Sequence, residues 1–396
     1  MDMHASASQP PPSAFRGAIV ATVALVAVFA AASAPIPLYA QYQSMLGISA
    51  ADVSQTVVSY LLGILAVLFF AGQLSDASGR RPAVAASLLC SIAGCFLFMG
   101  LANGAMLQFA RFVQGISCAL AMSATSAFVI DCASERYRTF GMTIASTGYL
   151  TGLTVGSLGI GVYACVSNEY WMVFAVLAGV MALTLAALPF TRETVERRIT
   201  LREAVKPMLH VPQHLRAVLP IAAGGYISTW CIGFFFQSLS TPASVDYFAA
   251  TDPLIPSLVL ALAMAPSALG GPLSARVGTR ASMIGGYVAM FAVSAALWVC
   301  MVQGNLMAFL ALEVVFAVST GVILSSSLHM LISTATPEEN ASVVSLANLS
   351  GYIGSTVIST AMTALSATLD LATVFALIIA MGAISIVPGC VCMRRL

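Results

Sequence analysis

The chain has 396 residues, of which 59% are hydrophobic and 8% are charged, and its formal net charge is +1. Soluble domains carry about 25% charged residues on average, whereas the mean hydropathy here is +0.95. A water-soluble fold could not bury this much apolar surface, so lipid is expected to surround most of the chain, and the balanced charge gives no reason to expect nucleic-acid binding.

Twelve apolar stretches of membrane-spanning length follow one another along the chain. Their predicted bounds are 17–40, 53–75, 83–102, 107–130, 139–166, 170–190, 217–240, 254–275, 281–302, 306–332, 341–366 and 371–392. The polar, proline-rich residues 1–15 are expected to form a disordered tail. The charged segment 191–216 is expected to be a cytoplasmic central loop that separates the six spans of 16–190 from the six of 217–396. The predicted fold is an all-α membrane protein.

Basic residues predict the orientation of these spans. If the N-terminus is cytoplasmic, segments on that side carry fifteen of the sixteen Lys and Arg residues, and Arg111 falls inside a span. Cytoplasmic loops of membrane proteins are enriched in these residues, and a different number of spans would scatter them over both sides. The sequence therefore predicts a multi-pass protein of the inner membrane with both termini in the cytoplasm.

Two patterns recur half a chain apart. GQLSDASGRR at 72–81 follows the second span and GPLSARVGTR at 271–280 follows the eighth, at an offset of 199 residues. Gly148-Tyr149-Leu150 in the fifth span is echoed by Gly351-Tyr352-Ile353 in the eleventh. Both repeats keep the same direction across the membrane, which is typical of transporters whose parallel halves hold a substrate near the midplane.

The segment 72–81 is similar to the signature of the loop between helices 2 and 3 of the major facilitator superfamily, roughly G-x-L-x-D-R-x-G-R-R/K. Ala77 departs from it, because the family often has a basic residue there. Arg111-Phe-Val-Gln114-Gly115 resembles a second signature, R-x-x-Q-G. The resemblance implies the major facilitator fold, with twelve helices in two pseudo-symmetric six-helix bundles, and a gating motif formed by Gly72, Asp76, Gly79, Arg80, Arg81 and Asp131.

The residue types of this motif suit a contact that forms and breaks. Gly72 and Gly79 permit a tight turn, and Asp76 is expected at the N-terminus of the helix predicted at 341–366. Arg80 is expected to pair with Asp131 at the cytoplasmic end of the fourth span. The alternative is a loop that is basic only because it orients the protein in the membrane.

Two ionisable side chains, Arg111 and Glu313, lie inside spans that the repeat makes equivalent. A charge at membrane depth costs at least about 2.5 kcal/mol, so each is expected to face a cavity or a partner. Glu313 is the candidate for reversible protonation coupled to transport, and Arg111 for holding the field of the site or binding an anion. The alternative is that both are shallow and reach the interface.

The predicted substrate site combines apolar surface with a few polar groups. Pro35 and Pro37 interrupt the first span, either for gating or for packing. The side chains expected to line an apolar cavity, with lipid-facing aromatic side chains as the alternative, are Gln114, Tyr226, Trp230, Gln237, Asn348 and Tyr352. His210 and His214 lack a third ligand nearby, so no metal is expected, and neither is a cofactor or a catalytic group.

Three functions are compatible with these patterns. The first is proton-coupled efflux of small amphipathic compounds by alternating access, and an apolar aromatic cavity favours it. The second is proton-coupled uptake of a metabolite or organic anion, which a site centred on Arg111 favours. A membrane-embedded enzyme or sensor is disfavoured, because no catalytic pair, metal motif or nucleotide-binding loop is present. Twelve helices suffice for a transport unit, so a monomer is expected.

Overall fold

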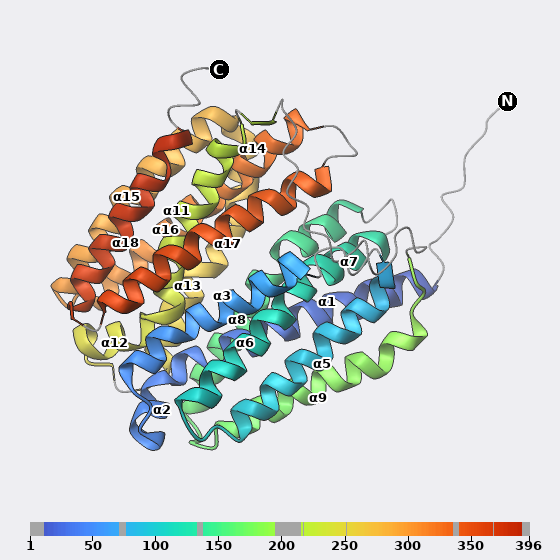
Figure 1. Ribbon diagram of the computed structural model, residues 1–396, viewed down its shortest axis with the longest axis horizontal. Coiled ribbons are helices and arrows are strands. Elements are labelled where there is room, and N and C mark those ends of the chain that lie inside the picture. Colours follow the sequence, from blue (N-terminus) through green and yellow to red (C-terminus); the bar gives the residue numbers. More distant parts are fainter. Residues whose placement is uncertain are drawn as a thin grey trace.

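The computed structural model describes residues 12–70, 77–132, 138–194, 215–216, 218–250, 252–335, 340–366 and 368–389, and within these ranges every regular element is helical (Figure 1). The elements up to residue 194 are α1 (Pro12–Ser33), η1 (Ile36–Leu38), α2 (Tyr39–Leu46), α3 (Ala50–Phe70), α5 (Arg80–Met99), α6 (Gly104–Leu120), a π-helical turn (Ala121–Thr125), α7 (Ser126–Cys132), α8 (Arg138–Ala164), α9 (Trp171–Ala187) and η4 (Leu188–Phe190). The later ones are α11 (Leu219–Ser238), α12 (Ser240–Phe248), α13 (Leu254–Met264), η6 (Ala265–Leu269), α14 (Gly270–Val277), α15 (Thr279–Val302), α16 (Leu306–Thr334), α17 (Asn340–Leu365) and α18 (Leu371–Ser385).

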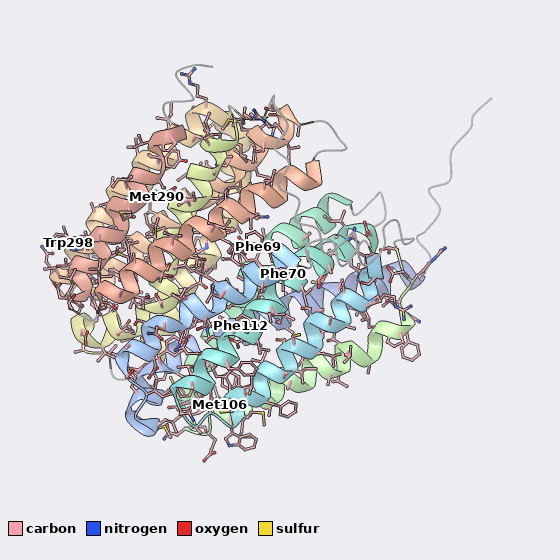
Figure 2. The ribbon with its side chains drawn as sticks, in the orientation of Figure 1. Phe69, Phe70, Met106, Phe112, Met290 and Trp298 are labelled. Atoms are coloured by element: carbon pink, nitrogen blue, oxygen red, sulfur yellow. The ribbon has the colours of Figure 1, made fainter. Side chains whose placement is uncertain are left out.

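Successive long helices run in opposite directions, so the assembly has two ends. We call them the α12 end, where α2 and α12 pack together, and the Arg80 end, where α5 begins. Figure 1 shows α2 and α12 side by side, with α7 and α14 toward the other end. In Figure 2, Met106 and Trp298 lie near the α12 end, Phe112 and Met290 near mid-depth, and Phe69 and Phe70 at the far end of α3.

Ten segments of the described chain are long and apolar enough to cross a membrane. The predicted spans 139–166 and 341–366 correspond to α8 and α17, which have 27 and 26 residues but are not among the ten. Both are rich in Gly, Ser and Thr, which lowers their hydropathy. The count of twelve spans therefore stays a prediction.

The first helix begins close to the predicted end of the N-terminal tail. The disordered tail was expected to reach residue 15, but α1 begins at Pro12. Proline is well tolerated in the first turn, because its missing N–H has no partner within the helix there. Residues 1–11 and most of the central loop, 195–214, lie outside the described residues.

Most of the closely packed helix pairs are not neighbours in the chain. α1 packs on α8, α3 on α6 and α5 on α9, while α11 packs on α17 and α15 on α16. Contacts between the portions before 194 and after 215 come chiefly from α8 against α13 and from α3 against α17. The two Gly/Ser/Thr-rich helices therefore face the opposite portion of the chain, where small side chains let backbones approach closely.

The α3–α6 contact depends on two glycines. A Cβ on Gly63 would strike the carbonyl oxygen of Phe112, and one on Gly115 would strike that of Tyr60. The later portion repeats this device, because a Cβ on Gly321 would strike the carbonyl oxygen of Ser267. Close backbone approach of this kind leaves no room for even one added carbon.

We therefore expect Gly115→Ala to push α6 away from α3 and to destabilise the fold by about 1–3 kcal/mol. The measurement is the thermal unfolding midpoint of the purified protein in detergent. Gly179→Ala in α9 is the matched control, because a Cβ there has nothing within 4 Å. Equal midpoints for the two variants would contradict the packing argument.

Candidate functional site

Arg80 and Asp131 form an ion pair at the Arg80 end. Arg80 Nε donates to Asp131 Oδ2 at 3.1 Å, with the two side chains 16% and 32% exposed. The same carboxylate oxygen accepts from Thr194 Oγ1 at 3.1 Å. The pairing expected from the sequence is therefore present, while the gating role assigned to it stays a prediction. A pair this exposed contributes little to stability alone, about 0–1 kcal/mol.

Glu193 is a residue of this site that no sequence pattern indicates. Its Oε1 accepts from the backbone N–H of Arg80 at 2.9 Å, and its Oε2 from that of Arg81 at 3.0 Å. A carboxylate at the first turn of a 20-residue helix satisfies free N–H groups and complements the helix dipole. Because 113 residues separate the partners, nothing in local spacing could have indicated the contact.

Gly79 is required at this junction for two reasons. Its φ of +99° lies in a region that side-chain-bearing residues rarely adopt. A Cβ there would also lie 2.8 Å from Glu193 Oε2. Gly278 before α15 shares the first reason, with φ +89°, at the 199-residue offset of the repeat, whereas a Cβ there would have nothing within 4 Å. Gly72 and Asp76 of the predicted gating motif lie outside the described residues.

Arg111 and Gln114 satisfy the broken end of α1. Pro35 has no N–H, so the carbonyl of Ala31 loses its helical donor. Gln114 Nε2 donates to this oxygen at 2.7 Å, and Arg111 Nη1 donates to the next carbonyl, that of Ala32, at 2.6 Å. Arg111 Nη1 also lies 2.8 Å from Gln114 Oε1. We call these two side chains the α1 clamp.

The surroundings of Arg111 are those of a buried cation. The residue is 1% exposed, and its guanidinium carbon lies 4.8 Å from the centroid of the Tyr60 ring, a distance at which a cation is attracted to the ring face. Its Nε has no hydrogen-bond partner among the described residues. The alternative that Arg111 reaches the membrane interface does not fit this burial, because the Ala32 carbonyl and the Gln114 amide oxygen hold its guanidinium inside the protein.

Glu313 is also buried, which contradicts the same alternative for this residue. It is 0% exposed, and neither carboxyl oxygen has a hydrogen-bond partner within the described part of the chain. Phe309 and Phe316 flank it on α16, and both rings lie against Phe236 of α11, with centroids 6.5 and 5.1 Å away. Desolvation therefore acts on this carboxyl group without a local partner to offset it.

Arg111 and Glu313 occupy equivalent positions in the repeat. Each is the eighth residue of its helix, counted from Gly104 and from Leu306. The residue before each helix is an asparagine whose side chain caps it, Asn103 through Met106 N and Asn305 through Ala308 N. A cation and a carboxyl group thus lie at the same depth from the α12 end.

Tyr226, Trp230 and Tyr352 come together as an aromatic cluster between α11 and α17. Tyr226 and Trp230 meet edge to face at 5.4 Å, and Trp230 packs against Tyr352 at 4.2 Å between centroids. Gly351 makes this possible, because a Cβ there would lie 2.9 Å from Tyr226 Cβ. Tyr226 is buried and Trp230 and Tyr352 are half-buried, so the three rings cover one another in part.

The other predicted lining residues are not part of this cluster. Gln237 lies about two turns beyond Trp230 on α11, and Asn348 about one turn before Tyr352 on α17; both are half-buried. The amide of Gln114 is engaged by the α1 clamp at both its oxygen and its nitrogen. Whether any of these residues contacts a substrate stays a prediction.

We expect Glu193→Ala to release the first turn of α5 and to cost about 1 kcal/mol, as for loss of a helix cap. The measurement is hydrogen–deuterium exchange of the peptide that begins at Arg80, which should speed up in the variant. Glu193→Gln keeps an acceptor and removes the charge, so it should fall between wild type and alanine. Unchanged exchange in both variants would remove Glu193 from the structural account.

We expect Arg111→Lys to fail as a conservative change, because an ammonium lacks the planar fork that reaches Ala32 and Gln114 together. Leaving a buried carbonyl unsatisfied costs about 1–3 kcal/mol, so the thermal unfolding midpoint should fall. Arg276→Lys, at an exposed arginine of α14, is the matched control. A shift no larger than in that control would show that the α1 clamp contributes no stability.

Similarity to known proteins identifies the family of this chain. The model of the Major Facilitator Superfamily matches residues 21–359. Quinolone resistance protein NorA of Staphylococcus aureus (strain MRSA252) is 24% identical over 157 residues, 39% of each chain. Multidrug resistance protein 2 of Bacillus subtilis (strain 168) is 22% identical over 211 residues, 53% of each chain. The matched region thus covers about half or less of each relative. The chain belongs to the major facilitator superfamily, a family of multi-pass membrane transporters.

Proposed function

We propose that this protein is a proton-coupled exporter of small amphipathic compounds, with twelve membrane helices in two six-helix bundles that work by alternating access. The portions 16–190 and 217–396 would be the bundles. The sequence repeat, the equivalent glycines 79 and 278 and the equivalent helix caps at Asn103 and Asn305 support two related halves. Membership of a transporter family favours a carrier over an enzyme.

The direction and substrate class are inferred from two observations. The relatives are named for quinolone resistance and multidrug resistance, which favours export of drug-like molecules. The aromatic cluster offers rings and tyrosine hydroxyls, a combination suited to apolar molecules that carry a few polar groups. Uptake of an organic anion would need Arg111 as its ligand, but Arg111 Nη1 is committed to α1.

Alternating access is supported by where the two halves are joined. Thr241 Oγ1 donates to Ile36 O at 2.7 Å, Thr363 Oγ1 to Ser54 O at 3.1 Å, and Ser157 Oγ to Ser257 O at 3.1 Å. All three bonds lie toward the α12 end. In the proposed orientation this is the outer side, so these bonds would form when that side is closed and break when it opens.

Proton coupling rests on a single observation, the buried carboxyl group of Glu313, which has no hydrogen-bond partner in the part of the chain that the structure describes. An ionised carboxylate in this apolar setting is costly, whereas access of water in another conformation would lower that cost. Protonation could thus alternate with the conformational change. The small molecule, the proton and the lipid bilayer are then the only partners the proposal needs, and a monomer suffices.

The test is proton movement in proteoliposomes that contain a pH-sensitive dye and carry an imposed proton gradient. Lipophilic cations, organic anions and sugars are added one at a time. We expect lipophilic compounds to release protons in wild type, and Glu313→Gln to abolish this flux, because the amide cannot take up a proton. Asp252→Asn, at a carboxylate that caps α13, is the control and should retain the flux.

The other outcomes separate the parts of the proposal. Flux that survives in Glu313→Gln would place the coupling group elsewhere. Movement of labelled solute without any proton flux would exclude proton coupling and leave a uniporter or another ion. Flux driven only by organic anions or sugars, in the inward direction, would favour the uptake alternative.

A further inference from the structure

A groove of about 890 Å³ lies at the α12 end, between the start of α3 and the elements α12, α17 and α18. Val53 and Val58 of α3 form part of one wall, and Leu239, Leu369 and Leu371 part of the other. Its size is that of a site for a drug-sized molecule. The groove lies apart from the aromatic cluster and from the α1 clamp, since none of their residues lines it.

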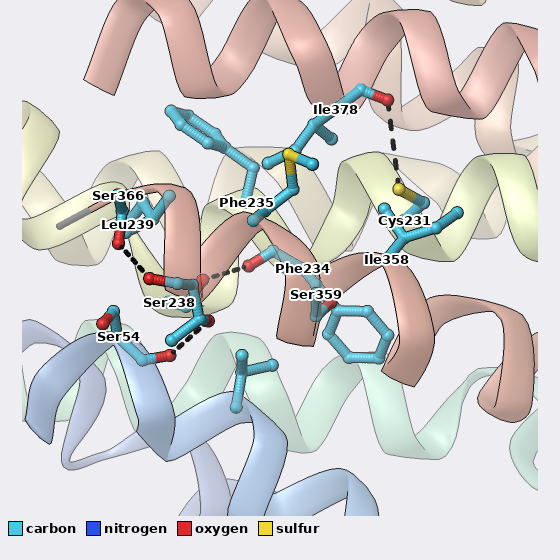
Figure 3. Close-up of a pocket in the computed structure, with 13 residues that line it drawn as sticks. Ser54, Cys231, Phe234, Phe235, Ser238, Leu239, Ile358, Ser359, Ser366 and Ile378 are labelled. Carbon is cyan, nitrogen blue, oxygen red and sulfur yellow. Dashed lines mark hydrogen bonds between the residues drawn. The ribbon is translucent and has the colours of Figure 1, made fainter. Parts of the chain in front are cut away.

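The floor of the groove is the seam between α3 and α17. Ser54, Leu239, Thr363 and Ser366 line both the groove and a small enclosed void beneath it, of about 20 Å³. Figure 3 shows this void, with Phe234 and Phe235 among the residues that line it. The hydrogen bond from Thr363 to the Ser54 carbonyl crosses the seam. In this conformation the groove is therefore a vestibule outside a closed contact.

The charged side chains that line the groove are carboxylates. They are Asp246 of α12 and Asp370, the residue before α18, and the described lining contains no Lys or Arg. The two have different duties. Asp370 caps α18, accepting from Thr373 N at 3.1 Å and Thr373 Oγ1 at 2.6 Å, and these bonds lower the pKa of Asp370.

Asp246 does not cap any helix of the described chain in this way. It is exposed at the groove, and partial burial raises the pKa of its carboxyl group. A negative charge that is partly desolvated beside apolar walls is complementary to a positive charge carried on an apolar body. Neutral or anionic compounds would gain nothing from it.

We propose that this groove is a release vestibule that binds amphipathic organic cations, with Asp246 as their ionic partner and the valine and leucine side chains as their apolar contact. The inference rests on the proposed export function and names the substrate class for its last step. A molecule that passes the α3–α17 seam would be held here before it leaves at the α12 end.

The test is protection of a cysteine inside the groove. Gln55, an exposed lining residue, is replaced by cysteine in a Cys165→Ser background, because Cys165 is the exposed cysteine of the described chain. The full chain in lipid nanodiscs reacts with a neutral maleimide. Tetraphenylphosphonium should slow the labelling, and tetraphenylborate, of the same shape and opposite charge, should not.

Asp246→Asn should raise the tetraphenylphosphonium concentration needed for protection by up to about five-fold, the worth of one exposed ion pair. Asp252→Asn, outside the groove, should leave it unchanged. Equal protection by both ions would mean a lipid-like apolar groove, and no protection by either would mean no site; both overturn the proposal. The midpoint of thermal unfolding of each variant confirms that it is folded.

Efflux of tetraphenylphosphonium from proteoliposomes is measured on the same variants. Protection without efflux would support the vestibule and contradict the proposed export. Efflux without protection would do the reverse. The two proposals therefore fail in distinguishable ways.

Discussion

The interruption of α1 at Pro35 leaves backbone carbonyls that need hydrogen-bond donors from the surrounding side chains. Proline removes the donor for the Ala31 carbonyl, and lipid cannot replace it as water would. Gln114 and Arg111 reach from α6 to the carbonyls of Ala31 and Ala32, and the ring of Tyr60 on α3 lies beside the guanidinium. Three helices are thus fixed relative to one another by one break, and any movement of the end of α1 must carry this contact along or exchange it.

The two halves are related by the repeat, but at the same depth one carries a basic side chain, Arg111, and the other an acidic one, Glu313. Arg111 is held by the Ala32 carbonyl, the Gln114 amide oxygen and the Tyr60 ring, so its charge has a fixed place in this structure. Glu313 lies beside phenylalanines and has no hydrogen-bond partner among the described residues. The hydrogen bonds of Arg111 stabilise the present arrangement of the helices. The buried carboxyl group of Glu313 instead favours a conformation in which water or another partner can reach it. The first half therefore provides a fixed frame and the second half the group able to respond.

The sequence predicted the helical fold well because length and hydropathy determine membrane helices directly. It also predicted the Arg80–Asp131 pair. It named Tyr226, Trp230 and Tyr352 among six cavity-lining residues, and the structure packs these three together, whereas the cavity itself stays a prediction. It missed Glu193, because a contact over 113 residues leaves no local pattern. It placed Gln114 at the substrate. The sequence cannot distinguish an amide that faces a cavity from one that binds the end of an interrupted helix, because the free carbonyl of Ala31 is found only in the structure.

The composition of α8 and α17 has a consequence for how the protein is made. The Gly, Ser and Thr residues that let these helices pack closely also add less apolar surface than Leu, Ile or Val would. Such segments partition weakly into lipid on their own and gain most from a helix already present. α1 and α11, on which they pack, are both synthesised before them. We therefore expect α8 to insert beside α1 and α17 beside α11, each against a helix that is already in the membrane. The order of synthesis would then contribute to correct folding.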